Sequence, residues 1–544
     1  MTKWSGRLIL GNKLFSREII TGTQAEHEAT MELKQIFSGK KADNVYLEHV
    51  DVMRWSEEEC FIEAGGYRIK CYSLPYTLSA DIESQLVFAD YHGESIALPS
   101  DPYGKIVVIP YPPDPDDAKF VLLKLYSAGA SAVIFYDTLP GRYRRIVVTG
   151  VEGYPYNYGA PPPIPAICIT KEDYLKLYMR RIREARVYVE TSIEHGAHGY
   201  NVVAVYNGSS EHEIVVSAHH DHWFTGFSDD LLGLEVLVRL ADKLEGMGRR
   251  YTVVLVSFTA EESGAPGYSG WYWIWGSRRY LENRLVKGDI DYILLDINVD
   301  ALFTRNVRVA YDPFLYSLVK RLVDRGFVAS DSLEIENPYF DSFSFTLYGI
   351  PSLTLHTFNE LRVNYHTNLD DGRENDPDLD IYTTELVYEL IRELSNRSLE
   401  EVYSLQWFRD TYSSHYTDEL PLETRVLFKK LSELYLISNN LDLYGFSRMF
   451  TRSFLKPVAT YRMNGLFETM FMPELMVGLR VLRGMGRCLR VDESYYVPGV
   501  EERILEVRGG VSGEFVKALY EFVRRSSARY MDLLNDLVGR FLRK

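Results

Sequence analysis

The chain has 544 residues, which exceeds the size at which one hydrophobic core stops growing, so several domains are expected. Its composition, 46% hydrophobic and 25% charged, is ordinary for a soluble globular protein. The net charge of −16 argues against nucleic acid as a partner, and no run of about 18–20 apolar residues predicts a membrane-spanning helix.

The cysteine spacing and the N-terminus bear on location. Cys60, Cys71, Cys168 and Cys488 are scattered and show no CxxC spacing. We therefore expect neither a disulfide framework nor a thiolate metal site, so any metal should be bound by nitrogen and oxygen. The only early apolar run, residues 8–10, is too short for a secretory signal. These features favour a cytoplasmic location by default.

The first part of the chain predicts one helix and then a separate segment. Residues 22–38 are typical of a helix with Thr23 as its N-cap. Residues 72–190 are rich in Tyr and Pro, and strands are predicted at 105–111 and 131–137 on either side of a helical stretch. This segment is predicted to combine strands and helices.

From about residue 197 to 398, short strands rich in β-branched residues alternate with helices. That alternation predicts a three-layer α/β domain with a mostly parallel sheet. After about residue 400 the chain is predicted to be helical, either as a dimerisation module or as a packed appendage. The predicted domains are 1–71 with 191–398, then 72–190 as the insert, then 399–544.

Acidic residues and histidines stand where the predicted strands of the α/β domain end. In open parallel sheets, ligands bind outside the carboxyl ends of the strands. In SAHHDHW (217–223), His219 and Asp221 share one face of the strand, so Asp221 is placed to support a site at His219. His220 falls on the other face and is interpreted as structural, and His222 is ambiguous.

Two pairs of adjacent acids follow. Asp229 and Asp230 precede a helix, and on their own they would be interpreted as an N-cap pair. After a His-x-Asp, one carboxylate can bridge two metals while its neighbour orients a ligand. Glu261 and Glu262 follow the next strand. In a metal site, one glutamate would bind the ion while the other takes a proton from water.

The last two segments supply further oxygen and nitrogen ligands. Asp296 and Asp300 lie on one strand face, and Asp300 is the better candidate because the deeper Asp296 would be costly to bury charged. His366 lies in the motif YHT, in the same strand-end cluster. His356 stands within a strand and is interpreted as a packed histidine.

The ordered motifs AHHD, SDDLLG, AEE, NVD and YHT resemble the M28 family of two-zinc aminopeptidases and glutamate-carboxypeptidase-like enzymes. The resemblance covers roughly residues 20–70 and 197–395. Residues 72–190 resemble the β-rich protease-associated domain that several members carry as an insertion. The helical tail resembles, in placement only, the C-terminal domain that mediates dimers in the carboxypeptidase branch, which suggests a homodimer.

The resemblance also implies a ligand set for two zinc ions, with cobalt or manganese as alternatives. One ion would be bound by His219 and Asp300, the other by Glu262 and His366, with Asp229 bridging them.

Catalytic roles are carried over in the same way. The resemblance implies that Glu261 is the general base, that Asp221 supports His219, and that Tyr365 helps to stabilise the tetrahedral intermediate.

Three features depart from the family pattern. Two leucines follow Asp230 where small residues are usual, and an aromatic insert at 268–275 could form a pocket wall or a core patch. Arg362 is the only arginine just upstream of His366, which argues against recognition of acidic side chains. We therefore predict a zinc-dependent exopeptidase acting on peptides, an aminopeptidase. The alternatives are a glutamate-carboxypeptidase-like enzyme, a glutaminyl-cyclase-like enzyme and a noncatalytic receptor-like binding protein.

Overall fold

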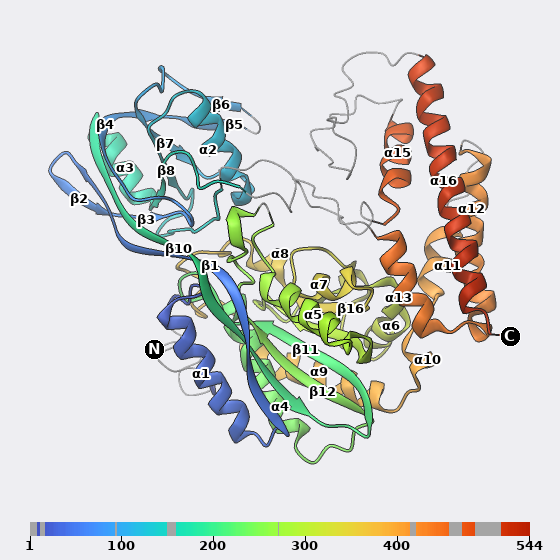
Figure 1. Cartoon of the computed structure of the whole chain (residues 1–544). Helices are drawn as coiled ribbons and strands as arrows, with labels where there is room; N and C mark the ends of the chain where they lie inside the picture. The colour runs from blue at the N-terminus through green and yellow to red at the C-terminus, as the bar shows by residue number, and fades with distance from the viewer. Residues whose placement is uncertain are drawn as a thin grey trace.

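A computed structural model gives the fold (Figure 1). It confirms the predicted class, an α/β protein with a large, mostly parallel sheet and a helical C-terminal region. The described residues are 8–10, 17–92, 95–149, 159–269, 271–413, 420–455, 471–484 and 513–543.

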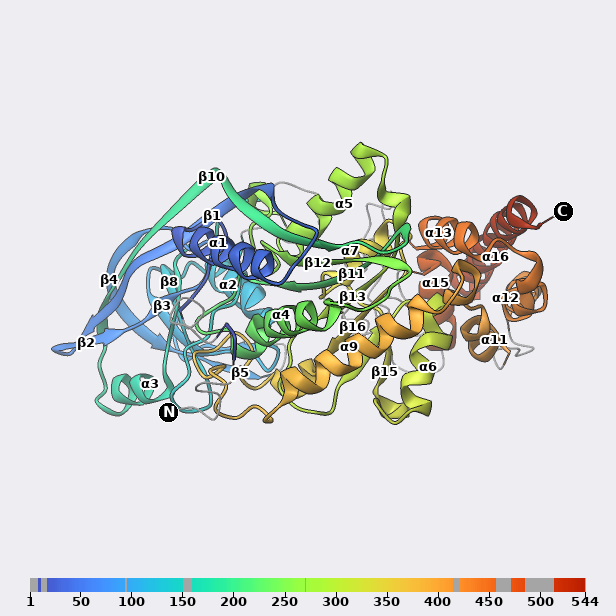
Figure 2. The same cartoon turned by 90° about the horizontal axis from the view of Figure 1, so that it is seen from below.

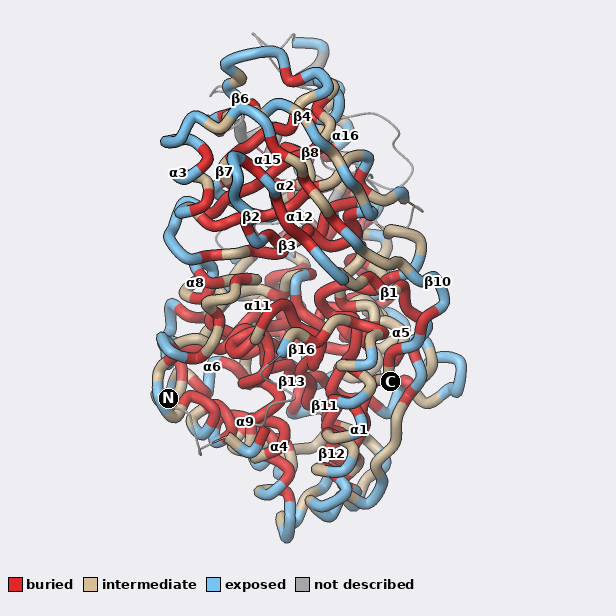
Figure 3. Tube along the Cα trace, turned by 90° about the vertical axis from the view of Figure 1, so that its left-hand side faces the viewer, coloured by how far each residue is buried: buried red, intermediate tan, exposed pale blue. Residues whose placement is uncertain are grey.

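The central sheet has the strand order β15-β14-β16-β13-β11-β12-β10. Its inner strands β16, β13, β11 and β12 are parallel to one another. β16, β13 and β12 consist entirely of buried residues, and β11 is buried from Ile214 to His219, as Figure 3 shows for this part of the chain. Strands covered on both faces should be nearly continuously apolar, as predicted. The bounds are β11 (Ser210–His219), β12 (Tyr251–Phe258), β13 (Ile293–Val299), β14 (Arg308–Tyr311), β15 (Leu333–Ile335) and β16 (Ser352–His356).

Helices cover both faces of this sheet (Figure 2). On β12, Val253 and Leu255 pack with the helices of one face, and Val254 and Val256 with those of the other, which is the period of two expected for a strand. The first face carries α1 (Gln24–Gly39), α4 (Leu232–Leu244) and α9 (Leu379–Ser395); the second carries α5 (Trp275–Lys287) and α7 (Ser342–Leu347). Thr23 caps α1, as predicted.

Two long antiparallel strands, β1 (Asn44–Ala64) and β10 (Glu184–Tyr206), join the central sheet to a second lobe. β10 pairs with β12 at one end and with β4 at the other, so it belongs to both sheets. We call the stretch between them, residues 48–57 of β1 paired with 191–201 of β10, the connecting ribbon. The domain boundary predicted at residue 191 falls within this strand.

The second lobe holds the sheet order β4-β7-β8-β9-β3, with helices packed on it. That this lobe is a protease-associated domain stays a prediction. Its elements are β2 (Tyr67–Lys70), β3 (Tyr72–Ser73), β4 (Ala80–Phe88), β5 (Asp90–His92), β6 (Ser95–Ala97), β7 (Ile106–Pro110), η1 (Pro115–Asp117), α2 (Ala118–Ser127), β8 (Ala132–Tyr136), β9 (Ala166–Ile169) and α3 (Lys171–Met179).

A disulfide joins Cys60 to Cys71, so the expectation that the cysteines form no disulfide is wrong. The β1–β2 hairpin brings the two residues opposite each other, with their Cα atoms 5.3 Å apart. The separation of 11 residues hid the pair because the hairpin was not predicted. Cys168 is free and buried, and Cys488 lies outside the described residues. The cysteines therefore give no support to a reducing compartment.

The C-terminal helices pack directly on the central domain. The ring of Phe314, from the central domain, lies 5.2 Å from that of Phe408 and 5.5 Å from that of Phe450, and the Tyr403 hydroxyl donates to Leu294 O. No helix among the described residues is long and apolar enough to cross a membrane. The helices are α10 (Leu399–Val402), α11 (Gln406–Tyr412), α12 (Leu422–Glu433), α13 (Leu443–Phe454), α15 (Pro473–Gly484) and α16 (Gly513–Phe541).

A buried arginine of the second lobe lies against the connecting ribbon. Only 2% of the Arg145 side chain is exposed; it is 2.7 Å from Glu18 and 3.4 Å from Glu57, and it donates to Ser73 O at 2.6 Å. Its guanidinium also lies 5.1 Å from the ring of Trp55. The segment before α1, the ribbon and the second lobe therefore meet at one cation.

Arg145→Met should lower the free energy of unfolding by about 3–5 kcal/mol, because it leaves Glu57 buried without its partner. Chemical denaturation followed by circular dichroism measures the change. The matched control is Arg186→Met, which removes an arginine that also bridges two carboxylates, Glu63 and Asp81, at the surface. The control should change stability little. Equal effects of the two substitutions would contradict the buried role of Arg145.

Candidate metal-dependent active site

His219 ends β11 and points one nitrogen at two carboxylates. Its Nδ1 donates to the main-chain oxygen of Asp221 at 2.8 Å. Because a carbonyl only accepts, Nδ1 carries a proton, which leaves Nε2 to face the carboxylates. That Nε2 is buried, lies 3.1 Å from Asp229 Oδ1 and 3.7 Å from Asp300 Oδ1, and has no hydrogen-bond partner. A nitrogen that faces two buried carboxylates requires a positive charge between them, which a proton or a metal ion can supply.

His366 forms the other half of the site. Its Nε2 lies 2.7 Å from Glu262 Oε2 and 3.8 Å from the second oxygen of Asp229. The other oxygen of Glu262 is buried without a hydrogen-bond partner. Asp229 thus turns one oxygen toward each histidine, and two sets of ligand atoms share it.

The turn before α4 fixes the orientation of Asp229. The main-chain N–H groups of Ser228 and Asp229 both donate to the buried carboxylate of Asp370, at 2.9 and 3.2 Å. Asp230 lies close to His219 and Asp300 and offers an alternative to Asp229 by distance alone.

The hydrogen bonds distinguish the two neighbouring acids. Both oxygens of Asp230 accept main-chain N–H groups, from Gly233 at 3.0 Å and His219 at 3.3 Å. A Cβ on Gly233 would lie 2.3 Å from the Asp230 carboxylate, so this approach requires glycine. We assign Asp229 to the metal and Asp230 to holding the helix start and the end of β11. Leu231 and Leu232, which depart from the family pattern, lie in the core.

Asp221 holds the two glutamates, which differs from its predicted role. Its carboxylate accepts the main-chain N–H of Glu261 and of Glu262, each at 3.0 Å, and the Thr21 hydroxyl at 3.0 Å. Its support of His219 comes from its main-chain oxygen, whereas its carboxylate is 4.0 Å from that ring. The sequence placed Asp221 correctly beside His219 and did not reveal that its side chain turns toward the next strand end.

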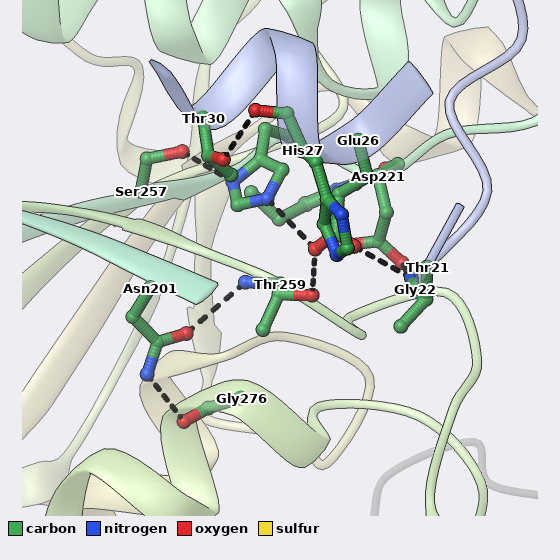
Figure 4. Close-up of polar contacts among 12 residues, drawn as sticks. Thr21, Gly22, Glu26, His27, Thr30, Asn201, Asp221, Ser257, Thr259 and Gly276 are labelled. Carbon is green, nitrogen blue, oxygen red and sulfur yellow. Dashed lines mark hydrogen bonds and ion pairs between the residues drawn. The ribbon is translucent and has the colours of Figure 1, made fainter. Parts of the chain in front are cut away.

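Behind these residues lies a buried polar network that includes the side chain of Glu26, from the first turn of α1 (Figure 4). Glu26 accepts the Thr259 hydroxyl and lies 3.3 Å from His220 Nε2, while His220 Nδ1 pairs with the Ser257 hydroxyl at 2.7 Å. The Thr259 main chain donates to Asn201 at 3.1 Å. His220 is therefore placed behind the site, on the face where it was predicted to be structural.

The remaining candidates lie apart from the two ligand sets. Asp296 is fully buried below Asp300 and accepts the Ser217 hydroxyl at 2.9 Å. His356 is buried, and burial lowers its pKa to about 3. Burial likewise lowers the pKa of His222 to about 3. Both histidines are therefore neutral.

Burial and mutual repulsion distort the charges of the site. Burial, and then the Asp300 carboxylate, raise the pKa of Glu261 well above its ordinary value, although His219 opposes the shift. Burial lowers the pKa of His219, but the carboxylates of Glu261, Asp229 and Asp300 raise it by more. The ligand atoms are nitrogen and oxygen, and two of them, His219 Nε2 and Glu262 Oε1, have no hydrogen-bond partner. Such a set fits divalent metal ions of the zinc type.

The loop that carries His366 is held by the second lobe. Residues 142–145 bind it along its length, and the Tyr365 ring both packs on the second-lobe core and stacks on His366 at 3.6 Å. The contacts are Arg142 Nη2 to Asn364 Oδ1 (3.0 Å), Tyr143 N to Asn368 Oδ1 (2.7 Å), Arg144 Nη2 to Val363 O (3.1 Å) and Arg145 N to His366 O (3.0 Å).

The tryptophans of the aromatic insert pack against the rest of the chain. Trp273 and Trp275 donate from their indoles to the main-chain oxygens of Pro338 and Asp51, at 2.7 and 2.8 Å, and Trp271 is buried in the core. The tryptophans therefore anchor the insert. Tyr272 lies on the side of the site: burial, and then the Asp116 carboxylate of the second lobe, raise its pKa well above the ordinary value.

Comparison with known proteins follows this geometry. Residues 201–391, which include all five predicted metal ligands, match Peptidase family M28. Carboxypeptidase Q of Bos taurus is 26% identical over an alignment of 278 residues, which covers 46% of this chain and 57% of that protein. The chain thus spans just over half the length of this relative.

Solved structures share the fold over about two thirds of the chain or more. A zinc aminopeptidase from Bacillus subtilis superposes with a TM-score of 0.54 at 19% identity, covering 70% of this chain and 91% of that one. An M28 peptidase precursor from Shewanella amazonensis gives a TM-score of 0.55 at 16% identity, covering 71% of this chain and 91% of that one. At such identities the likeness concerns the fold alone.

Sequence reasoning missed three contributors to the site. Asp370 was present in the NYHTNLDD segment, but paired acids in a loop are common and gave no reason to single it out. Residues 142–145 and Asp116 belong to the second lobe, and no motif connects them to the His366 loop, which lies 222 residues from Arg142 at its contact with Asn364. Only the folded chain brings them to His366.

His366→Ala should lower the zinc content by one ion per chain, because it removes the nitrogen that faces Glu262 and Asp229. Equilibrium dialysis followed by elemental analysis measures the content. The matched control is His356→Ala, which removes a buried histidine outside both ligand sets and should leave the content unchanged. An unchanged zinc content in His366→Ala would refute its assignment as a ligand.

Proposed function

We propose that this chain is a zinc-dependent exopeptidase that removes residues from the N-terminus of peptides. The observation that supports it best is the shared carboxylate: Asp229 faces His219 with one oxygen and His366 with the other, and Asp300 and Glu262 complete the two sets. This arrangement suits two ions. When bound, they would lower the pKa of a water molecule and polarise the peptide carbonyl.

Glu261 is suited to carry the proton between the attacking water and the leaving amine. It adjoins Glu262, its main chain is fixed by Asp221, and burial raises its pKa above the ordinary value, which favours its acceptance of a proton from water. Tyr365 is suited to donate a hydrogen bond to the developing oxyanion. Burial, and then Asp116, keep its pKa well above the ordinary value, so the hydroxyl stays protonated.

The charged residues near the His366 loop support cleavage at the N-terminus of the peptide substrate. A C-terminal carboxylate would need a free cation, but Arg362 is paired with Asp114 of the second lobe at 3.1 Å. Asp116, in the same short turn η1, is exposed and acts electrostatically on Tyr365 and Tyr272. An acid that acts on both tyrosines favours a substrate that brings a positive charge, such as an α-ammonium group.

The deciding experiment incubates the zinc-loaded protein with a mixture of unblocked peptides and follows the products by mass spectrometry. We expect stepwise loss from the N-terminus that a chelator stops. Glu261→Gln should keep its zinc and lose activity by about 10²–10⁴-fold, because only the proton carrier is removed. Loss from the C-terminus would assign the carboxypeptidase activity named for the bovine relative, and no metal-dependent loss would refute the exopeptidase proposal.

Asp116→Asn should raise KM for peptides with a free N-terminus by about tenfold, or about 1.4 kcal/mol, with little change in kcat. Steady-state kinetics on a short peptide measures both constants. The matched control is Glu83→Gln, which neutralises an exposed acid on β4 of the same lobe and should change neither. An unchanged KM in Asp116→Asn would remove this residue from substrate binding.

A further inference from the structure

Three metal-ligating side chains gather on the connecting ribbon, outside the active site. His49 and Asp51 come from β1 and His198 from β10. His49 Nε2 lies 2.8 Å from His198 Nδ1, and Asp51 Oδ1 lies 3.8 Å from the first nitrogen and 3.6 Å from the second. All three side chains are exposed, at 48%, 64% and 52%. The cluster is therefore open to ions from solution.

The ribbon backbone dictates this convergence. Residues two apart on a strand share a face, which aligns His49 with Asp51, and Asp51 lies directly opposite His198 in the ladder. The main chain beneath the cluster is also anchored. The Asp51 oxygen accepts the Trp275 indole N–H at 2.8 Å, and the His198 oxygen pairs with His27 Nε2 at 2.7 Å. The main-chain positions of Asp51 and His198 are thus fixed without an ion.

The donor set and spacing suit a tetrahedral ion. Bonds of about 2.0–2.2 Å to nitrogen and oxygen place ligand atoms about 3.3–3.5 Å apart. Two of the separations, 3.6 and 3.8 Å, are close to this value, and the hydrogen-bonded histidine pair at 2.8 Å needs to open by only about 0.5 Å. Among the described residues, no lysine or arginine pairs with Asp51 to compete for its carboxylate.

We propose that His49, Asp51 and His198 form a surface site for a divalent transition-metal ion, separate from the active site. Two imidazoles and one carboxylate select zinc, nickel or copper over magnesium and calcium. Solvent completes the coordination on the open side. The bound ion cross-links β1 to β10 within the connecting ribbon, between the two sheets that share β10. It therefore stiffens the link between the lobes.

The test counts ions on the full chain after stripping with chelator. At micromolar free zinc, equilibrium dialysis with elemental analysis should find one ion fewer per chain in His198→Ala than in the parent. The matched control is His195→Ala, which removes an exposed histidine from the same strand and should bind as the parent does. Equal zinc content in His198→Ala and the parent would overturn the site.

A second measurement separates this site from the proposed active site. In a His219→Ala/His366→Ala background, added zinc should still bind with one ion per chain and should raise the melting temperature. Adding His198→Ala should abolish both effects. Zinc binding that survives in the triple variant would overturn the ribbon site, whereas failure of peptide hydrolysis in the parent would bear only on the exopeptidase proposal.

Discussion

The structure depends on one electrostatic constraint: carboxylates are buried together at the strand ends of the central sheet. Asp229, Glu262 and Asp300 lie within a few ångströms of the two histidines and are nearly inaccessible to water. Two like charges 4 Å apart repel by about 4 kcal/mol at the effective dielectric constant near a protein surface. Such a cluster persists only with cations among it and with a backbone that does not yield to the repulsion.

A second group of acidic residues, whose carboxylates accept main-chain hydrogen bonds, keeps that backbone fixed. Asp221, Asp230 and Asp370 each accept main-chain N–H groups from the segments that carry the ligands. Each thereby ties a loop to its neighbour rather than binding an ion itself. This explains the Asp229–Asp230 pair, in which one carboxylate faces the site and the other holds the main chain in place. Substituting the second kind would disorder ligands that it never touches.

How much the sequence predicts depends on whether the information is local. Alternation along a strand placed His219 on the site and His220 behind it, and it placed Asp300 above the deeper Asp296. The same reasoning could not say where the Asp221 carboxylate turns, because its partners lie on a different strand. The Cys60–Cys71 bridge was missed because a hairpin register was needed to see it. Contacts between the two lobes produce no periodic pattern in the sequence, so they could not be predicted from it.

The ligands differ in how they are supported, and this difference gives the second lobe its importance. His219 ends a central strand, and Glu262 and Asp300 lie close to the ends of two others, so the sheet itself holds them. His366 lies in a loop, with φ of 56°, outside any helix or strand. Its position therefore relies on residues 142–145, which reach it from a lobe joined to the sheet by β1 and β10. Arg145 contacts both this loop and Glu57 on the ribbon. A shift of the ribbon would therefore change the position of His366 through this one residue.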